Sequence, residues 1–323
     1  MVEDEEGSLI SGDNANSAFS ALLKRSGVDK SGVELLVVEN IDSTNMKPDC
    51  WEKVGQIIAE EYDNHDSFLI TTGTNTLAYL ASALSFSLEN IDKPVVITGS
   101  QISFGKSNAD AVSNFVNALS VCRFAKATGV LVVFGSKIIR GCRSKKATDS
   151  ELDAFSSFNE ADVGNIGVDS GFYRDCVQHD PRKPFRLVNG FDPNICCLTL
   201  IPGLSETLFE SLIYAGTKGF ILRAYGTGDV SDYLFGSLEK CKNRQIPVVV
   251  TTQCPRGSTS IGKNRVGEDS KKFNVVEAVD MSMESMSTKL MWLIAQKYSY
   301  QEICNLMSKD FRGEISQKFV YTF

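Results

Sequence analysis

The residues that could do chemistry gather in short loops rich in hydroxyls, glycines and small amides. The two richest loops are Asp42-Ser-Thr-Asn-Met46 and Thr71-Thr-Gly-Thr-Asn-Thr76. Other loops of this kind are Gly99-Ser-Gln101, Gly135-Ser136, Tyr225-Gly-Thr-Gly-Asp229 and Thr252-Gln-Cys254. Hydroxyls and backbone N–H groups of this kind suit the binding of a compact polar ligand.

Several common catalytic chemistries lack the residues that they need. His65 and His179 are the only two histidines, each lies in a polar stretch, and no Cys-x-x-Cys pair occurs, so we expect no metal site. The chain also lacks a Gly-x-Ser-x-Gly elbow, a Walker loop and a Gly-x-Gly-x-x-Gly fingerprint. What remains is threonine or serine chemistry assisted by a lysine.

Charge and cysteine content limit the partners and the compartment. Against 40 Asp and Glu residues stand 33 Lys and Arg residues, and the net charge of −7 disfavours nucleic acid and anionic membranes as partners. No apolar run is long enough to span a membrane, which predicts a soluble protein. The 9 cysteines are scattered and odd in number, and no apolar segment follows Met1, so we expect reduced thiols in the cytoplasm.

The elements that must position these loops alternate between strands and helices. In the first half, strands are predicted at residues 34–39, 67–71, 94–98 and 129–134, with helices at 50–62, 75–90 and 110–127. This alternation predicts an α/β fold with a doubly wound, largely parallel sheet. Ligand sites of such sheets lie beyond the carboxyl ends of the strands, where the polar loops fall.

A long irregular stretch, residues 135–194, separates this region from a second alternating pattern. There the predicted strands are residues 196–201, 219–223 and 247–251, and the predicted helices begin at Ser205, Ser231, Met283 and Ser299. Ser299 and Glu302 form a capping-box pattern. For a chain of 323 residues we therefore predict a larger N-terminal domain over 1–190 and a smaller α/β C-terminal domain over 195–323.

Several of these motifs resemble one family. Thr72-Gly-Thr-Asn-Thr76, followed by an apolar helix, is similar to the His-Gly-Thr-Asp-Thr signature of the bacterial-type L-asparaginases, particularly the cytosolic type I group. Further segments that resemble the family, in the same order, are Asp42 to Met46, Lys93 to Gln101, Asp110, Arg140 to Phe155, Ile221 to Gly226, Thr252 to Cys254 and Lys309 to Glu314. The resemblance covers nearly the whole chain and implies the family's fold.

The resemblance also implies an activity and catalytic residues. In the family one threonine, in a Thr-Gly-Gly-Thr loop, attacks the side-chain amide of asparagine, and a second works with a lysine and an aspartate. Thr74 matches the second threonine, Lys146 the lysine, and Asn75 the aspartate. A buried amine has a lowered pKa and can accept a hydroxyl proton. The implied reaction converts asparagine and water to aspartate and ammonia without a cofactor.

Substrate-binding residues follow from the same resemblance. It implies that Ser43 and Thr44, beside Asp42, bind the substrate carboxylate, and that Glu284 also contacts the substrate. Asp229 stands where the family has asparagine, the reverse of the change at position 75. We therefore expect Asp229 to reach the ammonium pocket across a homodimer or homotetramer interface.

A regulatory site is a further implication. Arg223 and Cys254 match positions that resemble the regulatory asparagine pocket of some type I enzymes, while Lys145 replaces a threonine of that pocket.

Local sequence alone gives each of these residues a plainer interpretation. Thr74 would be a helix N-cap and Lys146 a solvated charge in a basic cluster. Ser43 would be a turn residue, Cys254 a buried small hydrophobe, and Arg223 a strand end paired with a carboxylate.

One departure from the family leaves alternatives open. No Thr-Gly-Gly-Thr loop occurs, and the strand expected before it is absent. We expect either a sequence that starts one strand late or a shortened paralogue. The matching functions are an asparaginase and a catalytically inactive relative that binds an amino acid or a protein partner. The tRNA-dependent amidotransferase subunit shares the signature, but the acidic charge argues against it.

Overall fold

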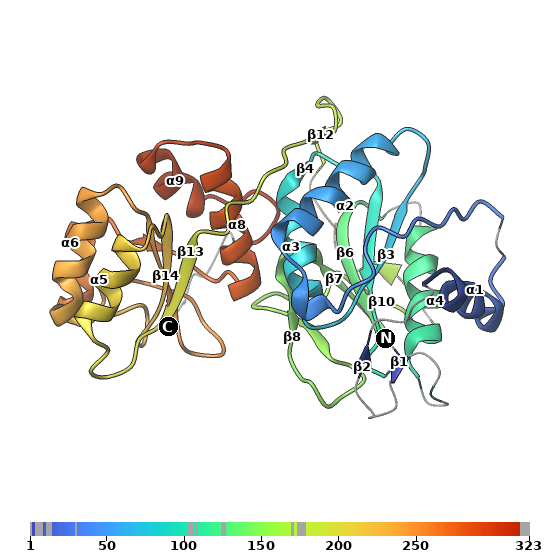
Figure 1. The fold of residues 1–323 in the computed structure, drawn as a ribbon, viewed down its shortest axis with the longest axis horizontal. Helices are drawn as coiled ribbons and strands as arrows, with labels where there is room; N and C mark the ends of the chain where they lie inside the picture. The colour runs from blue at the N-terminus through green and yellow to red at the C-terminus, as the bar shows by residue number, and fades with distance from the viewer. Residues whose placement is uncertain are drawn as a thin grey trace. The chain divides into compact units, whose positions relative to one another are not determined.

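The computed structural model describes residues 2–3, 9–10, 15–29, 31–102, 106, 109–123, 127–168, 171–172 and 179–316. The chain forms two compact units (Figure 1). The first comprises Met1–Ser157 and Ala161–Asn189, and the second comprises Phe158–Glu160 and Gly190–Phe323. The short piece Phe158–Glu160, between two stretches of the first unit, thus belongs to the second.

The first unit is built on a six-stranded sheet with the order β11-β10-β7-β6-β5-β3. Its strands are β3 (Phe68–Thr71), β5 (Pro94–Thr98), β6 (Gly129–Phe134), β7 (Lys137–Arg140), β10 (Gly164–Asn165) and β11 (Gly171–Phe172). The strands β3, β5 and β6 are parallel, as the alternating pattern predicted, whereas β7, β10 and β11 pair antiparallel. Both β5 and β6 are wholly buried, which explains their unbroken apolar sequences.

Helices cover both faces of this sheet. They are α1 (Ala15–Ser26), α2 (Pro48–Glu60), α3 (Leu77–Ser87) and α4 (Ala111–Cys122). In Figure 1, α2 and α3 lie on one side of the sheet, and α4 and α1 lie on the other. Phe19 of α1 packs edge-on against Phe115 of α4, with ring centroids 5.6 Å apart. Helix α3 is buried nearly all round, so its sequence is apolar on every face.

The strand predicted at residues 34–39 does not form. No backbone hydrogen bond joins the described residues 33–39 to β3, and Leu36 is 60% exposed. Lys53 of α2 holds the segment instead, through the Val38 carbonyl at 3.1 Å and the Glu39 carboxylate at 2.7 Å. Apolar β-type residues alone cannot make a strand, because an extended backbone needs a hydrogen-bonding partner. The outer edge of β3 is correspondingly only half-buried.

The stretch predicted to be irregular, residues 135–194, contains several short strands. Besides β7, β10 and β11, they are β8 (Ser144–Lys146), β9 (Phe155–Ser157) and β12 (Arg186–Leu187). Strand β8 pairs antiparallel with β9, and β12 pairs with β4 (Leu88–Glu89). Strands of two or three residues give too brief an alternation of apolar and polar positions to be found from sequence.

The second unit contains a parallel four-stranded sheet with the order β13-β14-β15-β16. Its elements are β13 (Ile195–Thr199), α5 (Glu206–Tyr214), β14 (Gly219–Ala224), α6 (Phe235–Asn243), β15 (Val248–Thr252), α7 (Arg265–Ser270), β16 (Val276–Glu277), α8 (Met283–Ala295) and α9 (Tyr300–Met307). The Ser205, Ser282 and Ser299 side chains cap α5, α8 and α9, and the capping box at Ser299 and Glu302 is confirmed.

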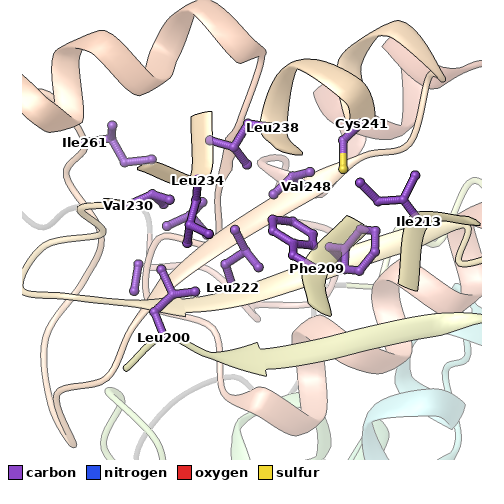
Figure 2. Packing of buried hydrophobic residues seen from close by; sticks show 13 residues of the cluster. Leu200, Phe209, Ile213, Leu222, Val230, Leu234, Leu238, Cys241, Val248 and Ile261 are labelled. Carbon is purple, nitrogen blue, oxygen red and sulfur yellow. The ribbon is translucent and has the colours of Figure 1, made fainter. Parts of the chain in front are cut away.

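The core of this unit lies between the sheet and the helices α5 and α6. Phe209 of α5 and Phe220 of β14 pack edge-to-face with centroids 4.9 Å apart. Figure 2 shows Leu234 and Leu238 gathered with Leu222 in the same cluster. Among the described helices of either unit, none has the length and apolar character that crossing a membrane requires.

A fully buried ion pair fixes the segment that follows α9. The Lys289 ammonium donates to the Glu314 carboxylate at 2.6 Å and to the Met307 carbonyl at 3.0 Å. Glu314 also accepts hydrogen bonds from the Phe311 and Arg312 backbone N–H groups. Burial would raise the pKa of Glu314, but the Lys289 charge and the hydrogen bonds to the carboxylate together hold that pKa below its usual value. Removing one partner would leave the other charge buried and uncompensated.

Lys289→Met should therefore lower the free energy of unfolding by about 3–5 kcal/mol. The matched control is Lys240→Met, which breaks the more exposed ion pair with Glu210 and should cost less than about 1 kcal/mol. Urea unfolding followed by circular dichroism measures both. Equal losses in the two variants would show that Lys289 does not anchor the segment.

Candidate active site

Two loops of the first unit meet just beyond the carboxyl end of β3. One links β3 to α3, and the other is the turn Ser43–Asn45, whose Thr44 N–H is capped by the Asp42 carboxylate at 2.7 Å. The Thr76 hydroxyl donates to the Ser43 carbonyl at 2.7 Å, and the Asn75 amide donates to the Thr44 hydroxyl at 2.9 Å. The structure thus brings together Asp42, Ser43, Thr44 and Asn75.

Two glycines permit this close approach. A Cβ at Gly73 would lie 2.5 Å from the Ser43 hydroxyl oxygen, and a Cβ at Gly99 would overlap the backbone oxygen of Thr72. Backbone atoms cannot move aside as a flexible side chain can. The position after β5 must therefore be glycine for the Thr72–Thr74 loop to keep its place.

Gly99→Ala should push this loop outward and lower the free energy of unfolding by about 1–3 kcal/mol through overpacking. Gly171→Ala is the control, because no atom of the described residues lies within 4 Å of a Cβ at that glycine. Thermal unfolding and hydrogen exchange at Thr72 and Thr74 provide the measurement. A variant at Gly99 that matches the Gly171 control in both readouts would contradict the packing argument.

Lys146 is brought to these loops by strand β8, where it lies opposite Phe155 of β9. Its ammonium donates to the Thr74 hydroxyl at 2.9 Å and to the Asn75 side-chain carbonyl at 3.0 Å. Burial lowers the pKa of Lys146, and the negative charge of Asp149 opposes that shift in part. The interpretation of Lys146 as a solvated surface charge is wrong, because its side chain is half-buried and hydrogen-bonded.

Thr74 is not the helix N-cap that local sequence suggested. Helix α3 begins at Leu77, and Thr76 occupies the cap position without a side-chain cap bond. The loop turns once more before the helix starts, which leaves the Thr74 hydroxyl facing Lys146. A lysine with a lowered pKa, 2.9 Å from a hydroxyl, can accept the hydroxyl proton. Asn75 is neutral, so it holds the amine without adding a negative charge.

The buried carboxylate of Asp110 holds the next loop of the site. The position of this residue was apparent from sequence, but its contacts were not. Asp110, before α4, accepts hydrogen bonds from the Gln101 and Ile102 N–H groups at 3.1 Å and from the Asn114 side chain at 2.9 Å. Asn114 in turn donates to the Gly99 carbonyl at 2.9 Å. The supporting roles of Gln101 and Asn114 were missed, because an amide on a helix or loop carries no distinctive sequence pattern.

The remaining predicted site residues belong to the second unit. The Asp229 carboxylate accepts from the Asn264 amide at 2.6 Å, and its other oxygen is buried without a hydrogen-bond partner among the described residues. Glu284 lies in the first turn of α8 and is partly buried. The Arg223 guanidinium contacts the Thr199 hydroxyl at 3.5 Å rather than a carboxylate. Cys254 is exposed, so its interpretation as a buried hydrophobe is wrong.

Cysteines and metal ligands give little further chemistry in the part of the chain that the structure describes. The eight cysteines found there, from Cys50 to Cys304, are all free. The described residues also contain no group of three or more His, Cys, Asp or Glu side chains that could hold a metal ion.

Comparison with known proteins defines the class to which this fold and site belong. Residues 1–178 match the family "Asparaginase, N-terminal", and residues 194–307 match the "Glutaminase/Asparaginase C-terminal domain". The chain belongs to the asparaginase family.

Individual relatives agree along nearly the whole length. An L-asparaginase of Thermococcus kodakarensis is 34% identical over 93% of this chain and 93% of its own, and L-asparaginase 1 of Escherichia coli is 34% identical over 85% and 82%. The solved thermostable L-asparaginase of T. kodakarensis superposes with a TM-score of 0.88 at 30% identity, covering 98% of this chain and 96% of the other. L-asparaginase I of Vibrio cholerae gives a TM-score of 0.79 at 30% identity, with 91% of both chains covered.

Proposed function

We propose that this protein is a cytoplasmic L-asparaginase, which hydrolyses the side-chain amide of asparagine to give aspartate and ammonia. The observation that supports this most directly is the hydrogen bond of 2.9 Å between the Lys146 amine and the Thr74 hydroxyl. The relatives named L-asparaginase, at 34% identity over most of the chain, support the choice of substrate.

The proposed roles follow from the charges at the site. Lys146, as a neutral amine, takes the proton from the Thr74 hydroxyl. The Thr74 oxygen in turn takes the proton of the attacking hydroxyl, which activates that hydroxyl as the nucleophile. The same proton then passes to the departing NH₂ group as the carbon–nitrogen bond breaks, and ammonia leaves. A water molecule then cleaves the ester that remains, which releases aspartate and restores the attacking hydroxyl. In the family that the motifs resemble, the attacking group is a threonine hydroxyl in a Thr-Gly-Gly-Thr loop. This sequence contains no such loop.

The substrate's polar ends have candidate partners in the neighbouring loop. The Ser43–Asn45 turn offers the hydroxyls of Ser43 and Thr44 as donors to the substrate carboxylate. Asn75 already contacts Thr44, so it joins this binding loop to Lys146. One residue thereby couples binding of the substrate to the proton-transfer pair.

Lys146→Met should lower kcat/KM for asparagine by about 10²–10⁴-fold, the usual contribution of a general base. The control is Lys53→Met on α2, which removes an exposed ion pair and should leave the rate unchanged. Ammonia release measures both, with the 323-residue chain and with the chain preceded by any residues that its gene encodes in frame before Met1. Binding of asparagine without ammonia release from either protein would favour the catalytically inactive relative.

Activity should fall as the pH decreases below the pKa of Lys146, because only the neutral amine accepts a proton. Asn75→Asp would place a carboxylate beside the ammonium, favour its charged form, and raise the pKa of Lys146 by about 1–3 units. The acidic limb of the kcat/KM profile should therefore move to higher pH by that amount. Asn75→Ser adds no charge, so its limb should not move upward. An unchanged limb in Asn75→Asp would show that Lys146 is not the titrating base.

We further propose a homodimer or homotetramer in which Asp229 serves the active site of a neighbouring subunit. The partial exposure of Asp229 supports this, because its carboxylate is not enclosed within its own chain. Asp229→Asn should raise KM for asparagine about tenfold, whereas Asp232→Asn should not, and sedimentation should give a dimer or tetramer mass. A monomer with full activity, or a structure placing Asp229 more than about 8 Å from Asn75 in every subunit pairing, would refute it.

A further inference from the structure

Val279 holds an unusual backbone conformation just before helix α8. Its φ is 57°, in the left-handed region. Six non-glycine residues have such a positive φ in the part of the chain that the structure describes, and Val279 is the only β-branched residue among them. Because a branched side chain crowds this conformation, the conformation persists only where neighbouring contacts hold it.

The two neighbours of Val279 explain why it takes this conformation. Ala278 is fully buried, and its N–H donates to the Val250 carbonyl of β15 at 2.9 Å. On the other side, the buried Asp280 carboxylate accepts hydrogen bonds from the Ser316 N–H at 3.0 Å and from the Ser316 hydroxyl at 2.6 Å. Since both neighbours are fixed, the change of chain direction falls on Val279.

Thr259 binds both backbone groups of Val279. The Thr259 hydroxyl accepts a hydrogen bond from the Val279 N–H at 2.8 Å, and the Thr259 N–H donates to the Val279 carbonyl at 2.8 Å. Thr259 is only 5% exposed, so its hydroxyl is shielded from competing water. These two hydrogen bonds form the Thr259–Val279 clasp, which holds the crowded backbone in place.

The turn after the clasp leads into the start of α8. Met281 and Ser282 are buried, and Ser282 caps the helix by accepting a hydrogen bond from the Ser285 N–H at 3.1 Å. Glu284 follows in the first turn of α8. The direction in which the chain leaves Val279 therefore sets the position of Glu284.

Thr259 and its neighbour also contact the loop that carries Asp229. The Ser260 N–H donates to the Thr227 carbonyl at 2.9 Å. A Cβ at Gly228 would lie 3.5 Å from the methyl carbon of Thr259, an ordinary packing distance. Thr259 thus lies between the loop with Asp229 and the turn that begins α8.

We propose that Thr259 is a positioning residue for the substrate-binding groups of the second unit. Its clasp on Val279 fixes the start of α8, and its packing on the loop 225–229 fixes the second segment. Two carboxylates, Asp229 and Glu284, thereby keep one placement relative to each other, and Thr259 acts through them rather than by touching the substrate. The consequence for asparagine rests on the proposed function, whereas the clasp itself does not.

The first test measures the clasp without using catalysis. Thr259→Val keeps the shape of the side chain but removes the oxygen that accepts from Val279. Hydrogen exchange followed by mass spectrometry should then speed up about 10- to 100-fold over residues 278–286, the effect of losing one buried hydrogen bond, and to a smaller degree over 225–230. Thr207→Val on α5 is the matched control, because that side chain is exposed, and it should leave both segments unchanged.

Two further variants separate the hydrogen bond from simple filling of space. Thr259→Ser keeps the hydroxyl and should restore most of the wild-type exchange, although it lacks the methyl group. Val279→Gly adopts the left-handed conformation without crowding, so in the Thr259→Val background it should recover part of the lost protection. Exchange over residues 278–286 that stays equal to the wild type and the Thr207→Val control in Thr259→Val overturns the clasp.

Kinetics of ammonia release by the full chain test the positioning role. In Thr259→Val the KM for asparagine should rise about five- to tenfold while kcat stays within about twofold, and Thr259→Ser should restore KM. Faster exchange with an unchanged KM in an active protein overturns the positioning role. A wild-type protein that neither binds asparagine nor releases ammonia would instead refute the proposed function, and the exchange rates would still decide whether the clasp exists.

Discussion

The site depends on one hydrogen bond that the chain can make only if three distant segments meet. The Lys146 amine comes from a short strand near residue 145, the Thr74 hydroxyl from the loop after β3, and Asn75 ties that loop to the Ser43–Asn45 turn. Strand β8 is fixed by its backbone pairing with β9, and the side chains of Thr76 and Asn75 join the two loops, so none of these supports uses the Thr74 hydroxyl or the Lys146 amine. The Thr74 hydroxyl and the Lys146 amine are therefore held in place while they stay free of structural hydrogen bonds other than those within the site.

The exchange of a carboxylate for an amide at position 75 changes the electrostatics of this site more than its geometry. The Asn75 side chain makes two contacts there: its carbonyl accepts a hydrogen bond from Lys146, and its amide donates one to Thr44. What it lacks is charge, and a partly buried amine without a charged partner gives up its proton more easily. An amide at position 75 thus favours the neutral form of Lys146, which the proposed hydrolysis needs, and it offers no negative charge to a substrate ammonium.

Much of the architecture could be predicted, because the repeat of apolar residues along a strand or helix can be read from neighbouring positions in the sequence. The buried strands β5 and β6 were found at the bounds that the structure gives, and the cap at Ser299 was identified from two residues. The segment 34–39 was wrongly predicted as a strand, because apolar alternation does not tell whether a pairing partner exists. At the site, the residue types were readable, but the supporting contact of Gln101 was missed, because its side chain binds the Asp149 carbonyl nearly fifty residues further along the sequence.

The half-buried outer edge of β3 lies in a unit that also leaves Leu35, Leu36 and Val37 exposed. Unpaired strand edges and nearby aliphatic side chains are the features through which folded proteins recruit extended segments of their neighbours. At high protein concentration, association of folded molecules through this surface should limit solubility before the buried core unfolds. A single lysine introduced along the edge of β3 should disfavour this association.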